Sequence, residues 1–103
     1  MNKLLIAIPT YNEIENVELM INAIKKYAPE ADLLFIDDNS PDGTGDVLEK
    51  LKKKFKKLHV MHREGKTGIG SAHQAGIQHA FTKKYDFLIF GTRRMPHRLL
   101  NFT

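Results

Sequence analysis

Short apolar runs alternate along the chain with segments in which apolar residues recur every third or fourth position. The runs are four or five residues long, as in strands that are buried on both faces of a sheet. We therefore predict strands over residues 4–8, 33–36, 58–61 and 87–90. Apolar residues spaced by three and four draw one stripe along a helix. This spacing predicts helices over about residues 14–28, 47–55 and 69–81.

Polar residues and a proline mark the ends of the first two predicted helices. Asn12 and Glu15 have the spacing of a capping box for the first helix, and Pro29 ends it. Asp42 or Thr44 is the predicted cap of the second helix.

The regular alternation of strands and helices predicts an α/β fold. Right-handed crossovers then give a mostly parallel sheet of about four strands, with helices on both faces. In such sheets, ligands bind outside the carboxyl ends of the strands. This rule selects residues 9–13, 37–45 and 63–70 and the segment after Phe90, and the first three of these are rich in polar residues and glycine.

Length and composition limit the class of protein. The chain has 103 residues, of which 42% are hydrophobic, so it has room for one small globular domain. It contains no cysteine, which excludes disulfides and thiolate metal sites and fits a reducing, cytoplasmic compartment. We identify no signal peptide, and no apolar run approaches the roughly 18 residues that span a bilayer.

Positive charge is concentrated in one lysine-rich segment. The formal net charge is +4, and six lysines lie within residues 50–57. Such a run is typical of binding to nucleic acid or to an anionic membrane surface, or of the solvated face of a helix. Single-stranded nucleic acid requires aromatic residues between the basic ones, and only Phe55 is so placed, where the helical spacing already explains it. We favour the solvated helix face and expect no nucleic-acid partner.

Two of the polar segments combine groups that a nucleoside requires. Pro9 ends the first strand, and Tyr11 and Glu13 follow it with an aromatic ring and a carboxylate. Asp37 and Asp38 close the second strand, where a carboxylate can accept paired hydrogen bonds from a base edge. Each residue also has a structural explanation, since an Asp can cap a turn and a Glu is favourable near the start of a helix.

The third polar segment combines basic residues with glycines before a helix. Lys66, Gly68 and Gly70 could bring the backbone and a positive charge close to an anionic group. Their spacing is not that of a Walker phosphate loop. Taken alone, the segment is equally consistent with an ordinary turn into the helix.

Together, the three segments resemble the successive blocks of family 2 glycosyltransferases, in order and over about residues 3–90. The stretch Ser40-Pro41-Asp42-Gly43-Thr44 is most similar to members of the dolichyl-phosphate mannose synthase type. The resemblance implies a partial Rossmann-like domain of the GT-A fold. It also implies that the donor nucleoside is lined by Pro9, Tyr11, Glu13, Ile36 and Asp38, with Asp37 as a structural neighbour. Lys66, Gly68 and Gly70 would approach the ribose or diphosphate.

The resemblance further implies a reaction and a cofactor. Intact relatives would move mannose from GDP-mannose to a polyprenyl phosphate at the cytoplasmic membrane surface, with Mg²⁺ or Mn²⁺ held by an Asp-x-Asp element after the fourth strand. In this sequence, no acidic residue follows Asp86. We therefore assign no catalytic residue and no metal ligand. Arg93 and Arg94 are an alternative cationic clamp for the diphosphate.

The match to the family predicts a division of the chain. Residues 1–90 are expected to form the nucleotide-sugar-binding part, and residues 91–103 depart from the family as a truncation or frameshift would. An uncovered edge beside the fourth strand would then favour self-association. Three alternatives stay open, namely a UDP-sugar donor, a non-catalytic nucleotide-binding domain and a receiver-type domain with an acidic pair at a strand end.

Overall fold

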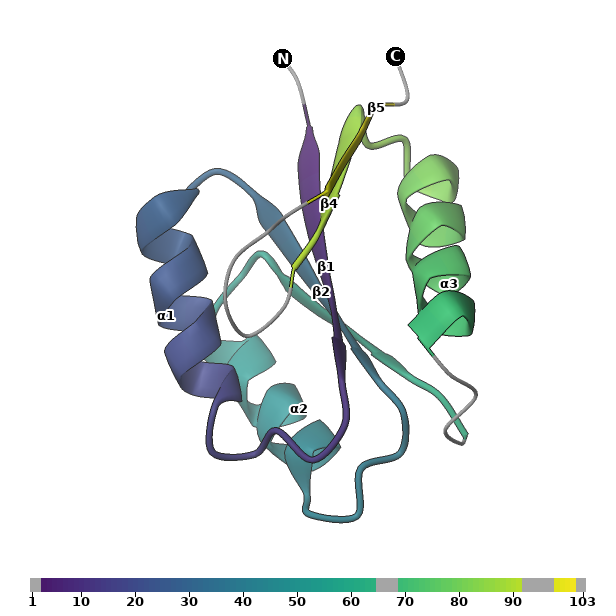
Figure 1. Cartoon of the computed structure of the whole chain (residues 1–103). Coiled ribbons are helices and arrows are strands. Elements are labelled where there is room, and N and C mark those ends of the chain that lie inside the picture. The colour runs from purple at the N-terminus through teal and green to yellow at the C-terminus, as the bar shows by residue number, and fades with distance from the viewer. Residues whose placement is uncertain (1–2, 65–68, 92–97, 102–103) are drawn as a thin grey trace.

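The computed structural model describes residues 3–64, 69–91 and 98–101 (Figure 1). In chain order, the elements are β1 (Leu4–Thr10), α1 (Val17–Tyr27), β2 (Asp32–Asp37), α2 (Thr44–Lys54), β3 (Leu58–His62), α3 (Ile69–Thr82), β4 (Phe87–Phe90) and β5 (Arg98–Asn101). The four predicted strands and three predicted helices are confirmed, and β5 is additional.

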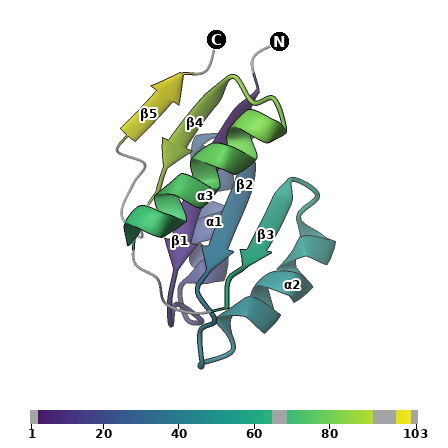
Figure 2. The same cartoon turned by 90° about the vertical axis from the view of Figure 1, so that its right-hand side faces the viewer.

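The sheet has the order β3-β2-β1-β4-β5, in which the first four strands are parallel (Figure 2). This is the mostly parallel α/β fold that the alternation predicts. From β1 the sheet grows on one side through β2 to β3, and β4 is then added on the other side of β1. Open α/β sheets bind ligands at such a switch point in the strand order. Receiver-type domains have the order 2-1-3-4-5, so the strand order contradicts the receiver alternative.

The helices cover both faces of the sheet. α1 and α2 lie on one face and α3 on the other (Figure 1). Side chains alternate between the two faces of a strand, so Ile6 and Ile8 of β1 join the buried cluster under α1 and α2, whereas Leu5 and Ala7 join the cluster under α3. This burial on both faces explains why the strands read as continuous apolar runs.

A glycine allows α3 to lie close to the sheet. A Cβ atom added at Gly76 would lie 3.0 Å from Phe90 Cε1 and 3.4 Å from Ala7 Cβ. A side chain at this position would require the Phe90 ring or the helix to shift.

Pro9 lies within β1 and does not end it, contrary to the prediction. It pairs with Ile36 of β2, whereas the pairing of β1 with β4 ends at Ala7 and Phe90. Proline has no N–H to donate and is tolerated where a strand has a neighbour on one side only. The strand therefore continues to Thr10.

The predicted capping box is also wrong. α1 begins at Val17, its N-cap is Asn16, and no side chain caps it. Asn12 has a φ of 56° and stands well before the helix. The backbone of residues 12–14 is held instead by side chains of the loop after β2.

The tail supplies β5, which apolar spacing did not predict. It pairs antiparallel with β4, from Phe87 opposite Asn101 to Phe90 opposite Arg98. The edge of β4 that we expected to be uncovered is therefore covered, and the predicted self-association cannot use it. An open strand edge carries unpaired N–H and C=O groups, which a nearby extended segment satisfies.

Candidate functional site

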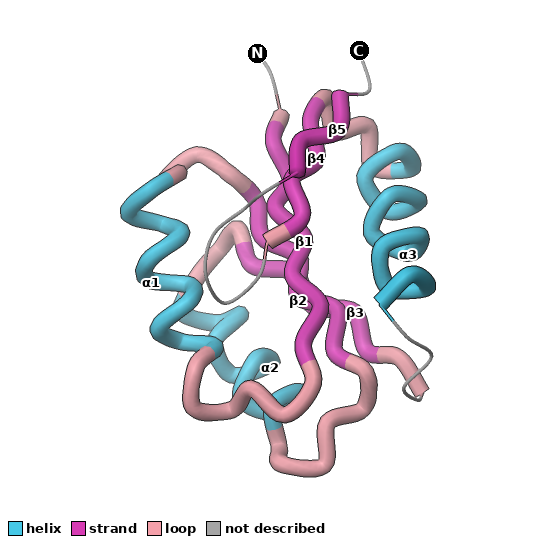
Figure 3. Tube along the Cα trace, in the orientation of Figure 1, coloured by secondary structure: helices cyan, strands magenta, loops and turns pink. Residues whose placement is uncertain are grey.

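The loops that follow β1 and β2 meet at the carboxyl edge of the sheet (Figure 3). Thr10 and Asp37 are paired at the ends of these strands. The structure thereby brings the β1 loop, with Tyr11 and Glu13, next to the acidic pair that closes β2. In the sequence, Tyr11 and Glu13 are 24 or more positions away from this acidic pair.

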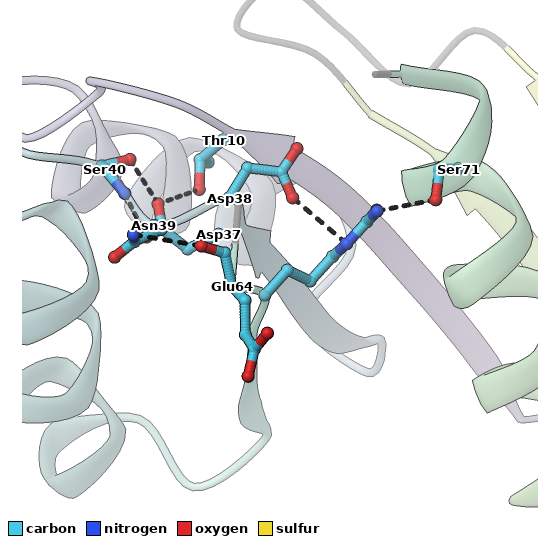
Figure 4. Close-up of polar contacts among 8 residues, drawn as sticks. Thr10, Asp37, Asp38, Asn39, Ser40, Glu64 and Ser71 are labelled. Carbon is cyan, nitrogen blue, oxygen red and sulfur yellow. Dashed lines mark hydrogen bonds and ion pairs between the residues drawn. The ribbon is translucent and has the colours of Figure 1, made fainter. Parts of the chain in front are cut away.

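Asp37 is a buried acceptor within the protein. Its Oδ1 accepts hydrogen bonds from the hydroxyls of Thr10 (3.0 Å) and Ser40 (2.6 Å), and its Oδ2 accepts one from the Ser40 N–H (3.1 Å) (Figure 4). Its exposed fraction is 2%. The Asp37 carboxylate thus joins the end of β1 to the turn after β2.

Asp38 is differently placed. Its side chain extends away from the Asp37 cluster toward α3 (Figure 4), and its Oδ1 lies 3.3 Å from Nε of Arg63 in a pair that is largely buried. Within the described residues, this Oδ1 accepts no hydrogen bond. Arg63 in turn donates from Nη2 to the hydroxyl of Ser71 in α3, at 2.6 Å. The Asp38 carboxylate at the end of β2 is therefore linked through Arg63 to Ser71 of α3, and it can accept further hydrogen bonds.

The Asp38–Arg63–Ser71 arrangement is a part of the site that sequence reasoning missed. Arg63 is the first residue after β3, and its N–H donates to the carbonyl of Asp37 at 2.8 Å. A basic residue at the end of a neighbouring parallel strand was the available signal, because carboxyl ends of parallel strands share one edge.

The other predicted donor residues have distinct surroundings. Tyr11 is exposed to 40%, and Glu13 is half-buried and accepts a hydrogen bond from the Asn16 amide at 2.9 Å. Pro9 lies half-buried in β1. Ile36 is fully buried in the cluster under α3, so its side chain supports the end of β2.

Asp42 connects the two loops and the start of α2. Its Oδ1 accepts from the N–H and hydroxyl of Thr44, at 2.9 and 2.5 Å, and its Oδ2 accepts from the Ile14 N–H at 3.2 Å. Burial acts to raise the pKa of Asp42, but these hydrogen bonds outweigh it and hold the pKa below its usual range. The predicted cap of the second helix is wrong, because the N-cap is Gly43, with a φ of 93°, and no side chain caps α2 from that position. Asp42 precedes the cap and binds the first N–H of the helix, that of Thr44.

Part of the predicted donor loop lies outside the described residues, namely Lys66 and Gly68, as do Arg93 and Arg94 of the tail. Gly70 is the second residue of α3. Across the part of the chain that the structure describes, no three His, Cys, Asp or Glu side chains are grouped so that they could hold a metal ion. The described residues therefore offer no such cluster for the divalent metal that the resemblance implies.

The sequence matches one family. Residues 5–90 match the sequence model of Glycosyl transferase family 2. An undecaprenyl-phosphate mannosyltransferase of Micrococcus luteus is 41% identical over 87 residues, which are 84% of this chain and 36% of that protein. A polyprenol monophosphomannose synthase of Mycolicibacterium smegmatis is 40% identical over 86 residues, which are 82% of this chain and 32% of that protein. The chain thus spans about a third of these relatives.

Solved structures share the fold. The mannosyltransferase PcManGT from Pyrobaculum calidifontis, in complex with GDP-Man and Mn²⁺, superposes with a TM-score of 0.77 at 18% identity, over 88% of this chain and 27% of that one. Residues 1–349 of S. aureus TarS, in complex with UDP, superpose with a TM-score of 0.73 at 25% identity, over the same shares. Among the described residues, no helix has the length and apolar character needed to cross a membrane.

Proposed function

Because this chain belongs to glycosyl transferase family 2, we propose that the carboxyl edge of its sheet binds the nucleotide of a nucleotide-sugar donor. The observation that carries the proposal is Asp38, a largely buried carboxylate at the end of β2 whose Oδ1 accepts no hydrogen bond from the described residues. Its contact with Arg63 Nε, at 3.3 Å, is an ion pair, so the carboxylate keeps lone pairs that can accept further hydrogen bonds. A nucleobase N–H group could donate to these lone pairs.

The chemistry of the base favours guanine. Guanine presents two adjacent N–H donors on its Watson–Crick edge, and one carboxylate can accept both. Uracil presents a single N–H donor on that edge. Tyr11, exposed to 40% in the neighbouring loop, supplies a ring on which a base could stack, and base stacking on aromatic rings typically contributes about 1–3 kcal/mol.

For the whole protein, we propose the transfer of mannose from GDP-mannose to a polyprenyl phosphate, as the names of the relatives suggest. An oxygen of the lipid phosphate would form the new bond to the anomeric carbon while the bond to GDP breaks, with inversion. GDP would leave with the electron pair of the broken bond. The part described here would hold the donor, and a lipid acceptor would place the protein at the cytoplasmic surface of a membrane.

Calorimetry on the whole chain tests the donor site. We expect GDP to bind without added metal and Asp38→Ala to weaken binding about ten- to hundredfold, since loss of a charged hydrogen-bond acceptor costs about 1.5–3 kcal/mol. Asp46→Ala is the matched control, because Asp46 is an exposed acid in the first turn of α2. Equal effects of the two substitutions would count against Asp38 as the base-binding residue.

A UDP-sugar is the second candidate donor. The structure of TarS with UDP has the higher identity to this chain, 25% against 18% for the GDP-mannose complex. The same titration with UDP decides between them, because a site that prefers UDP would assign the chain to UDP-sugar transfer.

A further inference from the structure

Three consecutive backbone N–H groups of the β1 loop are held by side chains of the β2 loop and of the first residue of α2. The Asn12 N–H donates to Ser40 Oγ at 2.9 Å, the Glu13 N–H to Thr44 Oγ1 at 3.0 Å and the Ile14 N–H to Asp42 Oδ2 at 3.2 Å. The partners are 28 to 31 residues apart in sequence. We call the side chains of Ser40, Asp42 and Thr44 the loop clamp.

Each hydroxyl of the loop clamp has a fixed orientation. Ser40 donates its proton to Asp37 Oδ1 at 2.6 Å, and Thr44 donates its proton to Asp42 Oδ1 at 2.5 Å. A hydroxyl has one proton to donate, so the oxygen of each is left to accept from the amide in front of it. The carboxylates therefore determine the direction in which both hydroxyls act.

The clamped backbone contains a left-handed residue and lies before the first helix. Asn12 has a φ of 56°, in the left-handed region that few residues other than glycine adopt, although asparagine adopts it more readily than most. α1 begins at Val17, and the Glu13 carbonyl accepts from the N–H groups of Asn16 and Val17. The N–H groups of residues 12–14 are held by the loop clamp. Strained conformations of this kind persist where the surroundings over-determine them, and they concentrate at ligand sites.

We infer that Ser40, Asp42 and Thr44 are positioning residues for the donor. They fix the backbone from which Tyr11 and Glu13 extend, and they act through that backbone without touching the nucleotide. The inference rests on the proposed function, because it assigns the clamped loop to the donor site. It gives Asp42 a role beyond the turn after β2.

Two pairs of variants separate positioning from general packing. Thr44→Val keeps the shape of a fully buried side chain and removes the hydroxyl, whereas Thr44→Ser keeps the hydroxyl. Asp42→Asn retains one oxygen for Thr44, but its NH₂ group cannot accept from the Ile14 N–H. Asp46→Asn is the control, since Asp46 is an exposed acid in the first turn of α2.

The experiment measures amide hydrogen exchange without nucleotide and GDP affinity by calorimetry, on the whole chain and at a temperature where every variant is folded. Thr44→Val and Asp42→Asn are expected to speed exchange at residues 12–14 and to weaken GDP binding about tenfold, the scale of one lost hydrogen bond. Thr44→Ser should restore both, and Asp46→Asn should change neither.

Unchanged exchange at residues 12–14 in Thr44→Val would overturn the clamp. Faster exchange with unchanged GDP affinity would overturn its positioning role, as would a serine variant that behaves like the valine one. Failure of the wild-type chain to bind either GDP or UDP is a separate result. It would overturn the proposed function, and the positioning role would fall with it.

Discussion

The two ends of the sheet use carboxylates in different ways. At the carboxyl edge, Asp37 and Asp42 accept hydrogen bonds from loop hydroxyls and amides. At the amino edge, Asp32 accepts from the hydroxyl of Tyr85 at 2.5 Å and lies 3.9 Å from His59 Nε2. The first arrangement holds loops beside each other, whereas the second fastens the segment before β4 to the start of β2.

The difference indicates where a lost hydrogen bond should affect binding and where it should affect only stability. At the carboxyl edge, Asn12 and Asn39 both have a φ of 56° and Gly43 has a φ of 93°. At the amino edge, Lys84 has a φ of 62°, and Lys3 Nζ lies 4.7 Å from the centre of the neighbouring Tyr85 ring. Left-handed backbone therefore occurs at both edges, and the expected division of effects rests on which hydrogen bonds hold the loops that we assign to the donor.

The largest expected effect is that of Asp37→Ala. The substitution removes an acceptor of three hydrogen bonds and leaves Thr10 and Ser40 without it. We expect the free energy of unfolding to fall by about 3 kcal/mol or more, measured by urea denaturation, and GDP binding to weaken as the loops separate.

Asp46→Ala is the control for this substitution and should stay within about 0.5 kcal/mol of the wild type. A similar small change for Asp37→Ala would show that the buried carboxylate does not hold the carboxyl edge together. The comparison of the two edges would then lose its basis.

A smaller effect is expected for Tyr85→Phe at the amino edge. Losing the hydroxyl bond to Asp32 should cost about 1.5 kcal/mol of stability and leave GDP affinity unchanged. Burial, together with the hydrogen bond to Asp32, raises the pKa of Tyr85. The folded state therefore keeps its proton when the unfolded state loses it, so stability should fall as the pH rises above about 10.

Denaturation from pH 8 to 11 measures this loss, and Tyr85→Phe should flatten it. Tyr27→Phe is the matched control, because the Tyr27 ring is 65% exposed. If Tyr85→Phe weakened GDP binding while the protein stayed folded, the two edges would be coupled and the proposed division of roles would be wrong.

His79, at the same edge, should make a smaller contribution to the dependence of stability on pH. Burial lowers the pKa of His79, and the charges of His59 and Lys83 lower it further. The unfolded state binds the proton more readily, so this contribution to stability is present above about pH 6.5 and is lost as the pH falls below it. His79→Gln should reduce the slope of stability between pH 7 and 5, whereas Gln78→Ala, an exposed change on the same helix, should not.

The regular elements were predictable because their signal is local. β1 and β2 are buried on both faces, so their sequences are continuous apolar runs. α1 and α2 are buried on one side, so their apolar residues recur every third or fourth position. β5 was not predictable in this way. Its placement depends on pairing with the free edge of β4, at a distance of up to 14 residues along the chain.

The candidate site was predictable only in part. The sequence identified Asp37 and Asp38 as a pair, but side chains of neighbouring residues in an extended segment point in opposite directions. Only the structure shows that Asp37 accepts a hydrogen bond from Ser40 and that Asp38 forms an ion pair with Arg63. The loop clamp was missed because its hydrogen bonds join segments that are distant in sequence. Asp42 was expected only as a possible cap of the second helix.

The smallest expected effect is that of a metal ion on nucleotide affinity. A metal-bound diphosphate needs protein oxygens near the end of β4, yet no acidic residue follows Asp86 in the sequence. At the neighbouring strand, Asp37 is occupied by Thr10 and Ser40 and Asp38 is paired with Arg63. Once GDP binding without metal is established, added Mn²⁺ should therefore change its dissociation constant by less than about twofold, or about 0.4 kcal/mol. Mg²⁺ should behave in the same way. Tightening by about tenfold or more, which is about 1.4 kcal/mol, would reveal metal ligands outside the described residues and would show that the carboxyl edge holds the diphosphate as well as the base.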